Sequence, residues 1–174
     1  YDDTDEGWAI APEYNWIEIS REERNRDFDG VRCDFEGRTE YDIGEAQVVD
    51  LGFTAQLYGH EYDQITIGSN GFVARGDQGE IVNFQNWPMD RAIGGGMGMI
   101  AVFWDWLEFQ NGSDVYYYYN EENGKFIVEW YKLEHHTDGE NDLTFQLILH
   151  DSAVWVSESG DSFIIFQYKS IENV

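Results

Sequence analysis

Acid-rich segments are the part of this 174-residue chain best suited to chemistry, and the chemistry they suit is calcium binding. Ca²⁺ takes clusters of carboxylate and carbonyl oxygens as ligands. None of the segments completes the twelve-residue loop of a helix–loop–helix calcium site, which needs a Glu at its last position, so ordinary solvated loops remain the alternative for each. The candidate ligands are Asp2, Asp3 and Asp5 in the first segment, Asp27 and Asp29 in the second, and Asp138, Glu140 and Asp142 in the third.

Two tryptophans form a second candidate site, for carbohydrate. Trp104 is the last residue of an apolar run, and Trp106 lies two residues further on, so an extended chain points both side chains to the same side. Exposed aromatic rings could stack on sugar rings, whereas buried rings would belong to the core. The pair therefore predicts a ligand-binding face only where the rings are exposed.

Nucleophilic and acid–base catalysis find no specific support. The chain lacks the Gly-x-Ser-x-Gly turn of the α/β-hydrolases, and 35 acids make close carboxylate pairs of the glycosidase type uninformative. The single cysteine, Cys33, excludes an internal disulfide and a cysteine-based zinc site. A lone cysteine is most often a small buried hydrophobic residue. We therefore expect a protein that is not an enzyme.

Net charge narrows the choice of partners. The chain has 10 Lys and Arg against 35 Asp and Glu, a formal charge of −25, which repels nucleic acid and anionic membranes. An aromatic content of 17% is high for a disordered acidic tail, so the chain folds. No apolar run approaches the roughly 18 residues of a membrane-spanning helix. The expected partners are therefore neither nucleic acid nor a bilayer.

The elements that must position these residues are strands. Residues 115–119 and 126–133 are two runs of strand formers joined by a turn that contains Asn123-Gly124, which predicts a hairpin. Alternation in the second run places Val128, Trp130 and Lys132 on one face and Glu129, Tyr131 and Leu133 on the other. Alternation along 116–119 leaves about two tyrosines on the outer face, where they favour contact with another surface.

Further strands are predicted on both sides of this hairpin. Residues 65–67 and 72–74 flank a Gly-Ser-Asn-Gly turn, residues 143–149 and 163–168 each follow a polar turn, and the apolar run 99–104 is typical of a strand buried on both faces. Ser20 and Glu23 have the spacing of a helix cap and allow one or two helical turns over 20–26. The pattern predicts an all-β fold, an antiparallel β-sandwich of jelly-roll or Ig-like type, with at most one short helix.

Several short motifs occur in order at residues 2–5, 11–19, 57–62, 65–72, 86–88, 99–105 and 126–130. Together they resemble modules of large secreted bacterial proteins that accompany gingipain-type cysteine peptidases. Among them, the order of strand, Ser-Asn-Gly turn, strand and a later Phe-Trp-Asp is also similar to nidogen-type extracellular domains. The resemblance implies an extracellular, non-catalytic β-sandwich and brings no catalytic residues. Where the pattern usually has two acids after Phe-Trp, this chain has Asp105-Trp106, which weakens any inferred ion site there.

We therefore expect residues 1–174 to form one β-sandwich domain, or a fragment of a longer chain that lacks its last strands. It would act outside the cell or on its surface as a structural or adhesive module, stabilised by calcium, in contact with neighbouring domains or subunits of a secreted assembly. Two alternatives stay open. One is a subunit of an extracellular filament or surface layer, in which a partner supplies a missing strand. The other is a carbohydrate-binding module with glycans as its partner.

Overall fold

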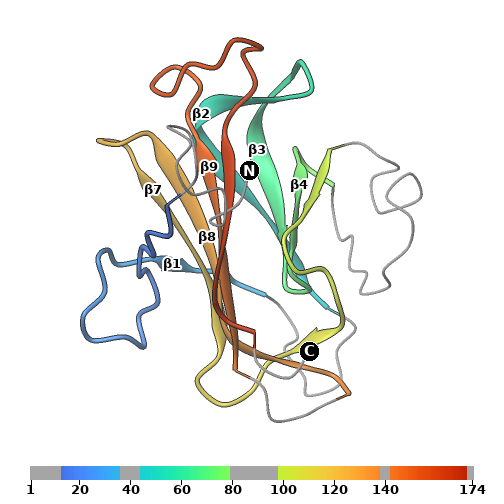
Figure 1. Cartoon of the computed structure of the whole chain (residues 1–174). Coiled ribbons are helices and arrows are strands. Elements are labelled where there is room, and N and C mark those ends of the chain that lie inside the picture. Colours follow the sequence, from blue (N-terminus) through green and yellow to red (C-terminus); the bar gives the residue numbers. More distant parts are fainter. Residues whose placement is uncertain (1–12, 36–43, 79–97, 138–141, 172–174) are drawn as a thin grey trace.

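The computed structural model describes residues 13–35, 44–78, 98–137 and 142–171, and these residues form strands joined by turns and loops, without a helix. Figure 1 shows the strands as two layers that face each other. The strands are β1 (Val31–Arg32), β2 (Ala46–Leu57), β3 (His60–Gly68), β4 (Phe72–Arg75), β5 (Met99–Ala101), β6 (Leu107–Glu108), β7 (Asp114–Asn120), β8 (Lys125–His135), β9 (Leu143–His150) and β10 (Ile164–Ser170).

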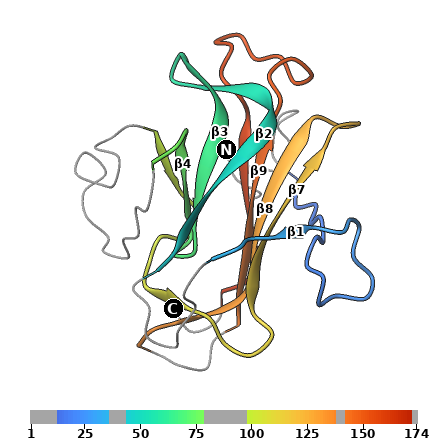
Figure 2. The same cartoon turned by 180° about the vertical axis from the view of Figure 1, so that it is seen from behind.

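The two layers are antiparallel sheets. Sheet A has the order β1-β7-β8-β9-β10, with β6 paired to the far end of β8, and sheet B has the order β2-β3-β4-β5. Figure 2 shows the same two layers from behind. Every pairing within the described residues is antiparallel. The all-β sandwich predicted from the strand pattern is confirmed, as are the hairpins β3–β4 and β7–β8.

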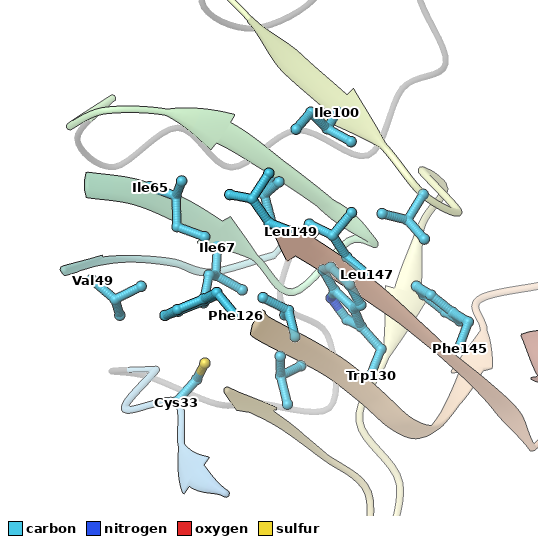
Figure 3. Close-up of a cluster of buried hydrophobic side chains, with 14 of the residues drawn as sticks. Cys33, Val49, Ile65, Ile67, Ile100, Phe126, Trp130, Phe145, Leu147 and Leu149 are labelled. Atoms are coloured by element: carbon cyan, nitrogen blue, oxygen red, sulfur yellow. The ribbon is translucent and has the colours of Figure 1, made fainter. Parts of the chain in front are cut away.

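Side chains from both sheets fill the space between the layers. Figure 3 shows this core, in which Ile65 and Ile67 of sheet B meet Phe126 and Trp130 of sheet A. Trp130 also joins the sheets by a hydrogen bond, because its indole Nε1 donates to the carbonyl oxygen of Gly68 over 2.9 Å. Cys33 is fully buried in the same cluster, as expected of a lone structural cysteine.

A bulge in β8 changes the faces predicted for that strand. The pairing of β8 with β9 shifts register between Trp130 and Leu133, and Lys132 adopts a positive φ of 53°. The extra residue reverses the alternation, so Leu133 packs in the core on the same side as Val128 and Trp130. The prediction that Leu133 faces away from Val128 was therefore wrong, because strict period-2 alternation ends at a bulge.

The apolar run 99–104 forms a shorter strand than predicted. Only Met99–Ala101 pair, as β5, and within the described residues β5 lies at the end of sheet B. The chain then bends, and the backbone N–H groups of Val102 and Phe103 donate to the carbonyl oxygen of Gly71. A tight turn in the neighbouring hairpin thus diverts the chain out of the strand after three residues.

Residues 13–30, which we call the strap, cross the outer face of sheet A. The capping pattern at Ser20 and Glu23 predicts one or two helical turns, but the structure has only tight turns there, one of which is closed by a bond from Glu23 N–H to the Ser20 carbonyl. The strap buries Ile19 against Ile127 and Ile148 on the sheet. Its packing against sheet A, and not local helix propensity, determines its path.

A row of buried polar side chains holds the strap to the sheet. Gln167 of β10, Gln146 of β9 and Glu129 of β8 are neighbours in register and lie in a line across the strands. Gln167 exchanges two hydrogen bonds with the backbone of Asn15, of 2.7 and 2.9 Å. Gln146 bonds both backbone groups of Ile17, and Glu129 Oε2 accepts from the N–H of Ile19 over 3.0 Å.

The strap also changes the prediction for the tyrosine run of β7. The outward-facing Tyr116 is buried against the strap cluster, and Tyr118 stacks on Phe28 of the strap with ring centroids 4.7 Å apart. Tyr117 and Tyr119 pack on the main core. Both faces of β7 are therefore covered, and the predicted outer tyrosine surface is occupied by the chain itself.

Candidate functional site

One end of the sandwich gathers half of the exposed large hydrophobic side chains of the described residues. We call this the loop end, formed by the β2–β3 turn (residues 58–59), the β7–β8 turn (121–124) and the β9–β10 loop (151–163), at the top of Figure 1. Ten large hydrophobic residues are exposed in the described part of the chain. Five lie at the loop end: Tyr58, Val154, Trp155, Val156 and Phe163.

The β9–β10 loop is held in shape by Asp151. The N–H groups of Val154 and Trp155 donate to the carbonyl oxygen of Asp151 over 3.1 and 2.8 Å, and the N–H of Ala153 donates to its Oδ1 over 2.8 Å. Asp151 N–H in turn donates to Gly124 on the β7–β8 turn. The loop therefore presents its apolar side chains from a fixed backbone.

Trp155 fixes the same loop through its side chain. Its indole Nε1 donates to the carbonyl oxygen of Asn123 over 2.8 Å, and the ring of His150 meets it edge-on at 4.8 Å. The ammonium group of Lys125 lies 5.3 Å from the centre of the indole, within the range of a cation–π contact. One side of Trp155 is thus used for anchoring while the residue remains 41% exposed.

The β2–β3 turn places an aromatic residue where a small polar one is usual. Tyr58 and Gly59 form a two-residue hairpin turn in which both have positive φ, 49° and 75°. Such turns favour Asn-Gly or Asp-Gly because a bulky side chain is strained in this region. Tyr58 is also 84% exposed, so burial of its ring does not compensate for the strain.

Hydrogen bonds join this turn to the β9–β10 loop. The N–H of Ser162 donates to the carbonyl oxygen of Gln56, and the N–H of Gln56 donates to the hydroxyl Oγ of Ser162. The side-chain Nε2 of Gln56 donates to Asp161 Oδ1 over 3.2 Å. Asp161 Oδ1 also accepts from the N–H of Gly59 over 2.9 Å. The bonds from Gly59 and Gln56 hold the pKa of Asp161 below its ordinary value. The two segments therefore form one surface.

A pocket of about 370 Å³ opens within this surface. It lies beside a wide bulge of β2, where four residues, 51–54, face one residue of β3. Phe53, whose ring lies tilted against that of Tyr119, supplies an apolar wall, and two acids, Glu61 and Asp151, supply negative charge. The volume is at the lower end of the range for ligand pockets. The remaining lining residues are Thr54, Gln56, Ser152 and Ala153.

Acidic side chains outnumber basic ones around the pocket. The described segments that form the loop end and the pocket contain no Lys or Arg, and Lys125 follows the β7–β8 turn directly as the first residue of β8. The acids of the same segments are Glu61, Glu121, Glu122, Asp151, Glu158 and Asp161. An exposed apolar surface is thus bordered by negative charge, an arrangement that favours a partner with apolar and positively charged groups.

The predicted calcium ligands are not brought together within the described residues. Asp27 Oδ2 accepts from the N–H of Glu18 over 2.8 Å, Asp29 pairs with Arg26, and Asp142 Oδ1 accepts from a side-chain amide 2.9 Å away. In the described part of the chain no three His, Cys, Asp or Glu side chains form a group that could hold a metal. Asp2, Asp3, Asp5, Asp138 and Glu140 lie outside the described residues.

The two predicted carbohydrate residues have different surroundings. Trp104 is 9% exposed and packs in a cluster with Phe72 and Met99. Trp106 is half-buried, with the ring of His136 stacked on it at 3.4 Å between centroids and 5° between planes. The described structure therefore offers no pair of exposed indole rings on one face at this position.

A buried carboxyl pair lies under the strap. Glu129 is fully buried, and burial together with the nearby charge of Glu18 raises its pKa to about 9. Burial also raises the pKa of Glu18, but hydrogen bonds with Lys169 and Glu129 outweigh burial and hold it below the ordinary value. Glu129 Oε1 has no partner as an acceptor. A proton on Glu129 that is shared with Glu18 gives both carboxyl groups a hydrogen-bond partner, so at neutral pH the pair carries one negative charge. Lys169 balances this charge, since its Nζ donates to Glu18 Oε2 over 2.7 Å.

The motifs that carried the resemblance meet in space. Asn70, in the Ser-Asn-Gly turn, accepts from Leu107 N–H through its side chain over 3.1 Å and from Asp105 N–H through its carbonyl. The carbonyl oxygen of Gly71 accepts hydrogen bonds from the N–H groups of Val102 and Phe103. The turn therefore organises the backbone of the Phe-Trp-Asp segment, which makes this combination of motifs structural.

The sequence model of the nidogen-related (NIDO-related) domain family matches residues 31–157, which is more than half of the chain. The chain belongs to this family. The nidogen-type part of the predicted resemblance is confirmed. Domains of the nidogen-related family are typically extracellular and are a non-enzymatic domain type. No curated protein and no solved structure is significantly similar to the chain.

The matched region contains most of the loop end, including the β2–β3 turn and Val154 to Val156. Among the described residues there is no helix long and apolar enough to cross a membrane. Sequence reasoning did not single out the loop end as a site. The signal that could have indicated it is Tyr58-Gly59 between two strands, since an aromatic residue is unusual in a two-residue hairpin turn.

Proposed function

We propose that this nidogen-related domain is an extracellular, non-catalytic module that binds another protein through the loop end. The observation that carries the proposal is the group of five exposed apolar side chains on a rigid backbone, with Tyr58 at its tip. Strained residues that persist in a fold are common at functional sites. Exposed aromatic residues are likewise enriched in protein interfaces.

Displayed random twelve-residue peptides, selected on the intact protein, test this proposal. Peptides that bind the protein should lose about tenfold or more in affinity for a variant with Tyr58→Asn and Val156→Ser, because central apolar anchors dominate interface energies. The matched control carries Val31→Ser and Ile171→Ser, which remove two exposed apolar side chains elsewhere on the surface. Selected peptides that bind the loop-end variant as well as the control variant would contradict the proposal.

Calcium stabilisation is a second part of the proposal. It is supported by the charge of −25, since dense like charges destabilise a fold unless cations neutralise them. Addition of calcium should raise the midpoint of thermal unfolding relative to the same protein in a chelator, because an ion that binds only the folded state stabilises it. Equal midpoints over a wide range of calcium concentration would contradict this part.

Assembly by strand addition is a second candidate function. Within the described residues β10 ends sheet A, and Phe166 and Tyr168 on this strand are exposed. An edge of this kind is able to pair with a strand from another chain. The molecular mass in solution decides, because a chain that remains monomeric at high concentration excludes assembly with itself. Association with gingipain-type peptidases stays a prediction of the sequence resemblance.

A further inference from the structure

We propose that the pocket at the loop end receives a lysine or arginine side chain of the protein partner, while the exposed apolar residues around it pack on apolar neighbours of that basic residue. The inference rests on the proposed function, because it assumes that a protein docks at the loop end. It adds the chemistry of the partner: a segment that is basic and apolar together.

The walls of the pocket fit a basic side chain with a long stem. Phe53 offers an aromatic wall, and lysine and arginine pack their methylene groups on apolar surface while the charged head reaches a polar group. Glu61, which also lines the pocket, is exposed, and its carboxylate makes no hydrogen bond or ion pair with any described residue. It is therefore available to accept from an incoming ammonium or guanidinium group.

Asp151 gives the pocket a second negative charge in a fixed position. It lines the pocket and is largely buried, and its Oδ1 accepts from the N–H of Ala153, so the carboxylate cannot reorient without loss of that bond. A neutral apolar occupant would cover Asp151 and Glu61 and leave both charges desolvated without a partner. A basic occupant pairs with them, and this difference selects for positive charge.

The surroundings of the pocket are preorganised for docking. The β2–β3 turn and the β9–β10 loop are joined through Gln56, Asp161 and Ser162, so little conformational freedom remains to be lost when a partner binds. Tyr58 extends from this rigid frame and is the most exposed of the large hydrophobic residues described. A partner that places a basic side chain in the pocket can bring an adjacent apolar side chain onto Tyr58.

Three synthetic peptides of eight residues test the inference by isothermal titration calorimetry at about 0.15 M salt, where charges more than about 8 Å apart are largely screened. The first alternates valine and lysine, the second replaces every lysine by ε-acetyl-lysine, and the third replaces every lysine by glutamate. The lysine peptide should bind, and the other two should bind at least about tenfold more weakly, because both lose the charge-assisted hydrogen bonds to the pocket.

Two protein variants locate the binding. Glu61→Gln should weaken binding of the lysine peptide by about tenfold, the effect of one charge-assisted hydrogen bond. Glu22→Gln is the matched control: it removes one exposed acid from the strap, so this variant has the same net charge as Glu61→Gln. It should change the affinity for the lysine peptide less than twofold, because charges far from the pocket contribute only screened attraction. Tyr58→Asn should also weaken binding, because the apolar half of the site is removed.

The outcomes separate this inference from the proposed function. Failure of the lysine peptide to bind, equal binding of the acetylated peptide, or equal effects of Glu61→Gln and Glu22→Gln would each overturn the basic-partner inference. Displayed peptides that depend on Tyr58 and Val156 but contain no lysine or arginine would also overturn it while they support docking at the loop end. Displayed peptides that bind regardless of Tyr58 and Val156 would overturn both.

Discussion

The buried carboxyl group of Glu129 makes a strong prediction for the variant Glu129→Gln. The wild-type side chain accepts from Ile19 N–H through Oε2, whereas its buried Oε1 has no partner as an acceptor and is satisfied when it is protonated and donates to Glu18. Glutamine has the same shape and presents the same pattern without a proton, since its oxygen accepts from Ile19 and its amide group donates to Glu18. The variant therefore keeps the hydrogen bond that holds the strap, and it does not need to bind a proton on folding.

The magnitude follows from the two pKa values. The pKa of Glu129 is about 9 in the folded chain and 4.5 as its ordinary value, so the folded state holds a proton that the unfolded chain releases between these limits. A folded-state pKa above the unfolded value contributes stability that is complete below about pH 4.5 and is lost as pH rises toward 9. At about 1.4 kcal/mol per pH unit, the loss from this group is about 3 kcal/mol at pH 7 and about 6 kcal/mol near pH 9.

Urea unfolding followed by tryptophan fluorescence between pH 5 and 9 measures this effect. The wild-type free energy of unfolding should fall with rising pH across this window, and that of Glu129→Gln should fall much less. At pH 7 the variant should be more stable by about 3 kcal/mol, which moves the urea midpoint up by about 1.5 M for a slope of about 2 kcal/mol per M. Glu121→Gln, an isosteric change at an exposed turn, should leave the pH profile of the wild type unchanged.

Parallel pH profiles for the wild type and Glu129→Gln would refute the reasoning, because they would mean that Glu129 binds no extra proton in the folded state. Glu129→Ala separates the proton from the hydrogen bond. It leaves the N–H of Ile19 buried without its acceptor and creates a cavity, so it should be less stable than Glu129→Gln at every pH, by about 3 kcal/mol. Equal stability of the Ala and Gln variants would show that the row of polar side chains does not hold the strap.

Three further substitutions, one of them with a matched control, test the turns and the core through their unfolding free energies. Tyr58→Asn should raise stability by about 1 kcal/mol, because Asn adopts positive φ with less strain, so the change that weakens binding strengthens the fold. Gly71→Ala should lower stability by about 3 kcal/mol, because its Cβ would overlap the backbone carbonyl oxygen of Phe103 and the residue has a φ of 77°. Gly112→Ala is the control: it has a similar φ of 84° but nothing within 4 Å of its Cβ, so it should lower stability by only about 1 kcal/mol. Trp130→Phe should cost about 2 kcal/mol, because the carbonyl of Gly68 loses its buried donor.

The hairpins could be predicted because each turn is specified by residues that are adjacent in the sequence. Asn123-Gly124 and the Ser-Asn-Gly turn each specify a tight connection, and the flanking runs alternate with a period of two. The same period failed at Leu133, since the bulge at Lys132 belongs to the pairing of β8 with β9 and is not marked by the residues of β8 themselves. Strand existence was therefore predictable, whereas the face of a single residue beyond a bulge was not.

The strap could not be predicted from the strands that it covers. Glu129, Gln146 and Gln167 have the alternation of polar residues on a solvent-facing side, and only the position of residues 15–19 across the sheet turns them into buried hydrogen-bonding groups. The strap also buries Tyr116 and, through Phe28, partly covers Tyr118, although alternation placed both at the surface. A sheet face is exposed or buried according to what crosses it, which is a property of the tertiary fold.

The acidic charge around the loop end opposes the self-association that its exposed apolar side chains would otherwise favour. An exposed group of Tyr58, Val154 and Val156 would favour self-association in a neutral protein, since apolar patches on two copies can bury one another. Here two loop ends brought face to face would also bring together two sets of acids, including Glu61 and Asp161, at distances where repulsion is not screened by physiological salt. A basic partner meets attraction from the same acids. The charge of −25 therefore does more than exclude nucleic acid and membranes: at this surface it opposes contact with another copy and favours a partner of opposite charge.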